Sequence, residues 1–148
     1  MAITSALRLS PTHQNRAIGS FKDTGTVKKS VVKLGFVPRH VKLIDATNRI
    51  SYEWYEGMAA DSAIKQVAAG TTTLETSNGI TVGALNTGTA DTWTVYEPTL
   101  QTVGTPSADP VTNTDMSRPN LANEVIVGFN APAAILTSNS QFYFIAED

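Results

Sequence analysis

The chain has 148 residues, a length that suits a single domain with its own hydrophobic core. It contains no cysteine, which excludes disulfide frameworks, thiol catalysis and thiolate metal sites. Only 16% of the residues are charged and the net charge is −2, whereas 20 threonines and 11 serines supply most of the polar groups. Because β-branched threonine suits a pleated strand, this composition favours a β protein.

Positive charge is concentrated in the first third of the chain. Residues 1–49 hold nine Lys and Arg against two acids, and residues 50–148 hold two against eleven, which gives +7 and −9. The split indicates a basic segment that meets an acidic partner, either nucleic acid or a second protein subunit. Alternatively, the two parts fold together and their charges mix on one surface. Direct nucleic-acid binding is disfavoured, because the basic residues are scattered without alternating aromatic residues and the isoelectric point is near 5.6.

Residues 1–23 show no clean hydrophobic period, so we predict an extended N-terminal arm with at most one short strand. Residues 1–8 lack the basic-then-apolar order of a signal peptide, and no run in the chain approaches the ~20 apolar residues of a membrane span. We therefore expect no membrane partner. A single β domain is expected to follow, over residues 24–148.

The first strands of this domain are predicted at 26–36, 40–47 and 49–55. In the last of these, Ile50, Tyr52 and Trp54 share one side, and this period of two is typical of a half-buried strand. An exposed strip of Tyr and Trp would suit stacking on sugar rings. We favour core packing for these two side chains, because an isoleucine lies on the same side.

Residues 58–69 form the one helical candidate. Ile64 and Val67 are three residues apart, alanine is frequent, and Asp61 is placed to cap the first turn. Gly70 would end the helix.

The second half of the chain alternates strand patterns with turn signals. We predict strands at 71–76 and 80–85, joined by a hairpin whose Asn78-Gly79 pair suits the positive φ that such turns need. Further strands are predicted at 91–97, 124–130 and 141–147, with a short one at 134–136. Residues 99–120 are rich in proline and threonine and predict a long loop. About eight short strands and at most one short helix predict an all-β fold, an antiparallel β-sandwich or barrel-like roll.

The sequence contains no recognisable catalytic, metal or cofactor site. His13 and His40 have no second histidine or carboxylate at ligand spacing. Glu53 and Glu56 flank two aromatic residues, but a separation of three along a strand points them to opposite faces. Phosphate-binding loops and nucleophile elbows are absent as well. We therefore expect a protein that is not an enzyme and has no cofactor.

Three short motifs stand between residues 35 and 82: a Gly-Phe-x-Pro strand start, a Glu-Trp-x-x-Gly-Met segment and a Gly-Ile-Thr-Val strand. They resemble a family of small structural proteins of tailed bacteriophages and prophages, some of which are similar to capsid decoration, or cement, proteins. The resemblance implies structural roles and no catalytic role for the motif residues, which include Gly35, Phe36, Pro38, Trp54, Gly57 and Gly79.

The resemblance implies a virion protein that is made in the cytoplasm of a bacterial host and binds the major capsid protein on the capsid surface. We expect a homo-oligomer, with a trimer at three-fold sites as one form, because many weak contacts gain avidity on a lattice. The basic residues expected to contact the capsid are Arg8, Arg16, Lys22, Lys28 and Lys29. The alternative is a carbohydrate- or receptor-binding β-module of a phage tail or fibre, which requires an exposed Trp54.

Overall fold

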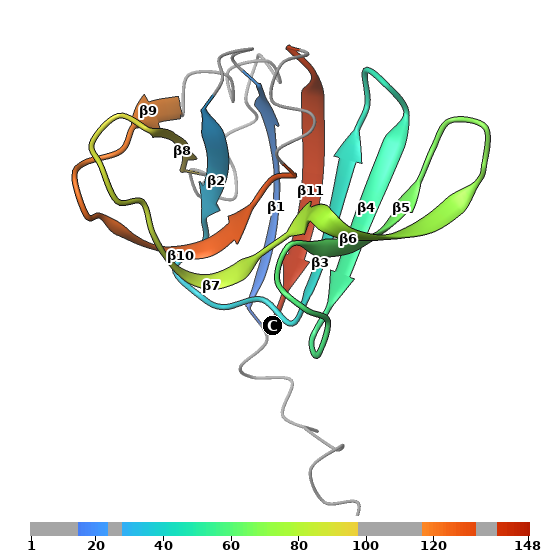
Figure 1. The fold of residues 1–148 in the computed structure, drawn as a ribbon, viewed down its shortest axis with the longest axis horizontal. Coiled ribbons are helices and arrows are strands. Elements are labelled where there is room, and N and C mark those ends of the chain that lie inside the picture. Colours follow the sequence, from blue (N-terminus) through green and yellow to red (C-terminus); the bar gives the residue numbers. More distant parts are fainter. Residues whose placement is uncertain (1–14, 24–27, 98–116, 133–138) are drawn as a thin grey trace, which may run out of the picture.

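The computed structural model describes residues 15–23, 28–97, 117–132 and 139–148. These residues form eleven strands and no helix, and the strands make two sheets that pack as a sandwich (Figure 1). The predicted all-β sandwich is therefore confirmed. None of the described segments forms a helix that could span a membrane.

Sheet A has six strands and sheet B has five. In spatial order, sheet A consists of β1 (Arg16–Lys22), β11 (Gln141–Glu147), β3 (His40–Asp45), β4 (Ile50–Tyr55), β5 (Ser62–Gln66) and β6 (Thr72–Ile80). Sheet B consists of β7 (Val82–Asn86), β10 (Val125–Asn130), β2 (Lys29–Lys33), β8 (Trp93–Tyr96) and β9 (Ser117–Pro119). Neighbouring strands are antiparallel except β2 and β8, which run parallel.

Most of the predicted strands are present. Those expected at 26–36, 40–47, 49–55, 91–97, 124–130 and 141–147 correspond to β2, β3, β4, β8, β10 and β11. The short strand predicted at 134–136 lies outside the described residues. So does the predicted loop up to residue 116, whereas residues 117–119 form β9, which the sequence did not indicate.

The main core lies between the two sheets and is rich in aromatic rings. Phe21 of β1 packs on Tyr96 of β8, with ring centroids 4.4 Å apart, and on Phe142 of β11 at 5.1 Å. Phe129 of β10 meets the edge of Phe144 of β11 at 5.4 Å. All five side chains are at most 2% exposed. Because the Phe21–Tyr96 and Phe129–Phe144 pairs each join a strand of sheet A to a strand of sheet B, the aromatic core holds the sandwich together.

Sheet B also buries its second face. Val31, Val95 and Ile126 are fully buried in a cluster that is separate from the main core. Side chains alternate along a strand, so Val31 points away from its neighbour Val32, which belongs to the main core. The central strands of sheet B are therefore apolar on both sides.

The predicted N-terminal arm contains a strand of the sandwich. Residues 16–22 form β1, which pairs with β11 along its whole length. Phe21 of this strand is 1% exposed in the main core. The folded domain therefore includes β1, and residues 1–14 of the predicted arm lie outside the described residues.

The helix predicted at 58–69 is wrong, because this segment contains β5, which pairs with β4 and β6. Ala63 is buried and Ile64 is exposed, as the alternation of a strand requires. Asp61 does not cap a helix: it has a φ of 60°, and its amide donates to the hydroxyl of Thr81 at 3.0 Å. Pairing with two strands outweighs the local helix preference of the alanine-rich segment.

The hairpin predicted at Asn78-Gly79 is also wrong, since β6 runs through this point to Ile80. The register between β5 and β6 shifts here, next to Ser62. A Cβ on Gly79 would lie 2.1 Å from the backbone carbon of Ser62. Glycine is therefore needed for the close approach of two backbones and not for a turn.

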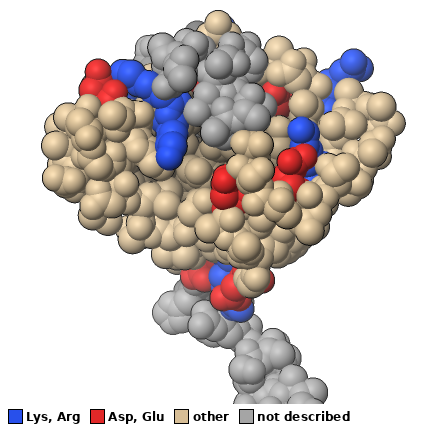
Figure 2. All heavy atoms as spheres, viewed as in Figure 1, with Lys and Arg blue, Asp and Glu red and all other residues tan. Residues whose placement is uncertain are grey.

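Charges from the two parts of the sequence mix on the folded surface. Ion pairs join basic residues of the first 49 to acids of the remaining chain: Arg16–Glu147 at 3.1 Å, Lys28–Asp91 at 2.6 Å, Lys33–Glu97 at 3.5 Å and Lys42–Glu53 at 3.3 Å. Figure 2 shows charged side chains of both signs in small groups on a mostly uncharged surface. In the described part of the chain, the sequence asymmetry therefore does not become a separate basic face.

Candidate functional site

The outer face of sheet A, which points away from sheet B, exposes many apolar side chains. Nine large hydrophobic residues are exposed in the described part of the chain. Six of them project from this face: Ile18, Ile44, Tyr55, Ile64, Leu74 and Tyr143. Several large apolar side chains exposed on one face mark a site where a protein meets other molecules. The outer face is therefore the candidate interaction surface.

Strand register aligns the side chains of this face in rows across the sheet. The central row, from β1 to β6, consists of Ile18, Ile145, Lys42, Glu53, Ile64 and Leu74. Lys42 Nζ lies 3.3 Å from Glu53 Oε1, so the charged middle of the row is paired within the sheet. Two apolar residues flank this pair on each side.

Two further rows flank the central row. The uncharged row consists of Ser20, Tyr143, Ile44, Ser51, Gln66 and Thr72. The charged row consists of Arg16, Glu147, His40 and Tyr55, and it ends at β4. Apart from the Lys42–Glu53 pair at the centre, the charged side chains that the strands present on this face lie at its two margins, in the charged row and at Lys22 at the end of β1.

His40 stands between two carboxylates in the charged row. Its Nδ1 lies 3.6 Å from Glu147 Oε2, and its Nε2 lies 3.9 Å from Glu53 Oε2. Its ring stacks on Tyr55 with the centroids 4.7 Å apart. Sequence spacing could not show these neighbours, because the two carboxylates come from β4 and β11.

The charge of Glu53 is fixed by its neighbours. The Tyr55 hydroxyl donates a hydrogen bond to Glu53 and, with Lys42, holds the pKa of this carboxyl below its usual value. The same contact raises the pKa of the Tyr55 phenol. At neutral pH the centre of the face therefore presents one anion beside one cation.

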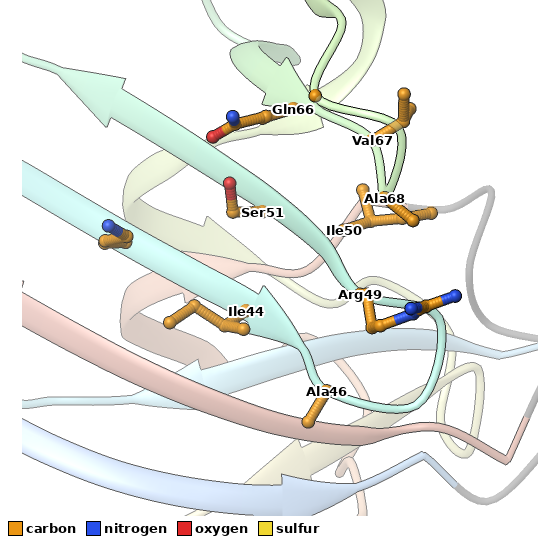
Figure 3. Close-up of a pocket in the computed structure, with 10 residues that line it drawn as sticks. Ile44, Ala46, Arg49, Ile50, Ser51, Gln66, Val67 and Ala68 are labelled. Atoms are coloured by element: carbon orange, nitrogen blue, oxygen red, sulfur yellow. The ribbon is translucent and has the colours of Figure 1, made fainter.

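A shallow hollow of about 420 Å³ lies beside the uncharged row where the row crosses β3, β4 and β5, between the β3–β4 and β5–β6 turns. Ile44, Ser51 and Gln66 line it from neighbouring strands, whereas Arg49 and Val67 come from the turns (Figure 3). The lining is mixed, because Lys42 and Arg49 are among its residues beside the apolar side chains of Ile44, Ile50 and Val67. The hollow therefore offers both apolar surface and positive charge to a binding partner.

The structure separates the basic residues predicted to contact a capsid. Arg8 lies outside the described residues. Arg16 and Lys22 are the first and last residues of β1, about 20 Å apart, and Arg16 belongs to the outer face of sheet A. Lys28 pairs with an aspartate before β8, and Lys29 Nζ lies 5.3 Å from the centroid of a β8 tryptophan ring. The described members of this set therefore do not form one patch.

The residues of the three motifs lie at turns, near a strand start or in the core of the fold. Gly35 and Gly57 have φ values of 80° and 94°, a region that favours glycine. Phe36 packs against the main core, and Pro38 stands two residues before β3. Trp54 is 7% exposed and belongs to the main core, as predicted. Its burial removes the aromatic platform that the carbohydrate-binding alternative required.

No known protein family, curated protein or solved structure matches this chain. Among the described residues, no group of three or more His, Asp or Glu is placed to hold a metal ion. The fold and the site together define a β-sandwich protein with one exposed, partly apolar sheet face.

Proposed function

We propose that this chain is a non-enzymatic structural protein of a tailed-phage virion, which decorates the capsid and stabilises it by binding the major capsid protein. The observation that carries the proposal is the outer face of sheet A, where six exposed apolar side chains are spread over three rows. A broad sheet face suits contact with other protein subunits, whereas small ligands are usually enclosed in deep, concave sites.

The motif residues support this proposal. The residues that resemble the phage family shape the β scaffold: Gly35 and Gly57 at turns, Gly79 at a close backbone approach, and Trp54 in the core. A resemblance carried by scaffold residues fits a structural family better than an enzyme family, whose shared residues would gather at a reaction centre.

Lys22, Lys28 and Lys29 remain the residues that we propose for the capsid contact. They lie at the end of β1 and the start of β2, away from the central row of sheet A. Charged contacts at the margin of an interface chiefly set association rate and specificity. The binding strength would come from many copies on one lattice.

The proposal is tested by quantitative mass spectrometry of purified virions of the phage or prophage that encodes this chain. We expect a copy number equal to that of the major capsid protein or a simple fraction of it. A ratio of a few per cent would contradict a lattice-wide role and favour the tail, collar or fibre. Absence from the virion would overturn the proposal altogether.

A further inference from the structure

The central row of sheet A is self-complementary. From β1 to β6 it presents two apolar residues, a cation, an anion and two apolar residues, which are Ile18, Ile145, Lys42, Glu53, Ile64 and Leu74. If a second copy faces the first with its row in the reverse order, the apolar residues of one row face apolar residues of the other, and each Lys42 faces the Glu53 of the other copy. We infer that the outer face of sheet A binds a second copy of this chain in a two-fold symmetric dimer.

The row selects one orientation of the second copy. Sheets that pack face to face keep their strand directions aligned within about 30°. A two-fold axis parallel to the strands, between β3 and β4, turns the second copy over and reverses its row. Ile18 then faces Leu74 of the second copy, Ile145 faces its Ile64, and Lys42 faces its Glu53. An axis perpendicular to the strands would instead place each Lys42 over its own counterpart, where the charges repel.

The flanking rows are compatible with this orientation. Reversal of the uncharged row places Tyr143 over Gln66 of the second copy and Ile44 over its Ser51, so no charge is buried there. In the charged row, Arg16 and Glu147 lie on β1 and β11, at the margin of the face. Their side chains are 57% and 42% exposed, and they can stay hydrated at the rim of the dimer.

The face is large enough for a reversible dimer. Six strands span about 29 Å and the two complete rows span about 13 Å, and the charged row adds four strands, about 19 Å by 7 Å, given the usual strand spacing and rise. This corresponds to about 500 Å² on each copy and about 1,000 Å² in total, near the lower limit for a specific interface. We therefore expect a concentration-dependent equilibrium between monomer and dimer. The inference uses the same face that supports the proposed function and names a second copy of this chain as the protein subunit that this face contacts, which leaves the basic residues near the start of β2 for the capsid contact. Measurements on the purified chain without capsid test the dimer separately from the capsid role.

Charge exchange at the centre of the row tests the inference by sedimentation velocity of the purified full-length protein over a range of concentrations. In a dimer of the Lys42→Glu variant, positions 42 and 53 of each copy are both carboxylates and face the same two carboxylates of the other copy. In a dimer of the Glu53→Lys variant, both positions are cations and face cations. We expect each variant alone to raise the dimer Kd at least about 10-fold, since burying like charges against each other is unfavourable. An equimolar mixture of the two variants should form a heterodimer, because every facing pair is then of opposite sign.

Folding is checked by circular dichroism, and Lys33→Glu in β2 serves as the matched control that should dimerise like the unmodified chain. Leu74→Asp is a second test, because it removes one apolar end without touching the central ion pair, and it should also weaken the dimer. The inference is overturned if the unmodified chain stays monomeric at the highest concentrations. It is equally overturned if the two charge variants dimerise normally, or fail to associate when they are mixed.

Discussion

Asn120 joins two connections at the edge of sheet B. Its side chain is 3% exposed, and its Oδ1 accepts a hydrogen bond from the amide of Trp93 at 2.6 Å. Its Nδ2 donates to Thr87 Oγ1 at 3.0 Å and to the carbonyl oxygens of Thr89 and Leu121 at 3.1 and 2.8 Å. One amide therefore fixes the segment before β8 against the segment before β10. A buried group with several partners is costly to remove, because the partners stay buried.

Asn120→Ala is expected to lower the free energy of unfolding by about 2–3 kcal/mol, since the amide of Trp93 loses its acceptor in a buried place. Urea unfolding monitored by circular dichroism gives the value. The matched control is Asn86→Ala, which removes the same side chain from an exposed position in the same region, where Oδ1 accepts only from Gly88. That control should cost less than about 1 kcal/mol. Equal losses in the two variants would contradict the role assigned to Asn120.

At the scale of single elements, the position of β1 determines which N-terminal truncations keep the fold. It forms one edge of sheet A, and its only strand partner among the described residues is β11. Phe21 nevertheless contributes a central ring of the core, in contact with both sheets. Removing residues 1–23 would therefore destroy part of the core, whereas removing residues 1–14 leaves β1 intact.

The shorter truncation, lacking residues 1–14, is expected to unfold cooperatively with a thermal midpoint close to that of the full chain. The longer truncation, lacking residues 1–23, is expected to lose the cooperative transition. Loss of one core Phe costs about 3–5 kcal/mol, and a whole strand costs more, against a typical total stability of about 5–15 kcal/mol. Thermal unfolding followed by circular dichroism compares the two. A cooperative transition in the longer truncation would show that β1 is dispensable.

The elements also show where sequence patterns succeed and where they fail. Strands with a strict period of two, such as β4 and β11, were predicted close to their bounds, because burial on one face imposes that period. β5 was missed because it has five residues, of which only Ser62 and Ala63 are buried, so the local alanine-rich composition suggested a helix. Gly79 was assigned to a turn because Asn-Gly is a strong turn signal, whereas its actual constraint is a contact with another strand.

At the scale of the whole molecule, the interaction surface could be predicted only in part. In β11, Phe142 and Phe144 alternate with Tyr143 and Ile145, so the sequence alone shows a strand with apolar residues on both sides. One side fills the core, and the other belongs to the outer face of sheet A. The rest of the face combines residues from the five other strands of sheet A, and its rows depend on the register between strands that are distant in sequence, such as β1 and β11. The basic residues were grouped by sequence position, which the fold does not preserve.

The stability of the molecule should depend on pH through three ion-paired carboxylates. Hydrogen bonds from Arg118 lower the pKa of Glu124 from the ordinary value of 4.5 to about 2, and Arg118 also lowers the pKa of Glu97. The hydroxyl of Tyr55 lowers the pKa of Glu53. As the pH falls below the pKa that these carboxyls have in the unfolded chain, the unfolded chain binds more protons than the folded chain. The stabilisation is therefore complete above about pH 4.5 and is lost as the pH falls toward 2.

Urea unfolding at a series of pH values from about 6 to about 2 measures this dependence, because that range covers the interval between the unfolded and folded pKa values. We expect Glu124→Gln to flatten the fall in stability on the acid side, because a neutral amide has no proton to gain there. Arg118→Leu should flatten it further, since this guanidinium contacts both Glu97 and Glu124. Added salt should weaken the dependence, because these side chains are partly exposed and screened. An unchanged acid slope in both variants would mean that the ion pairs around Arg118 do not stabilise the folded chain.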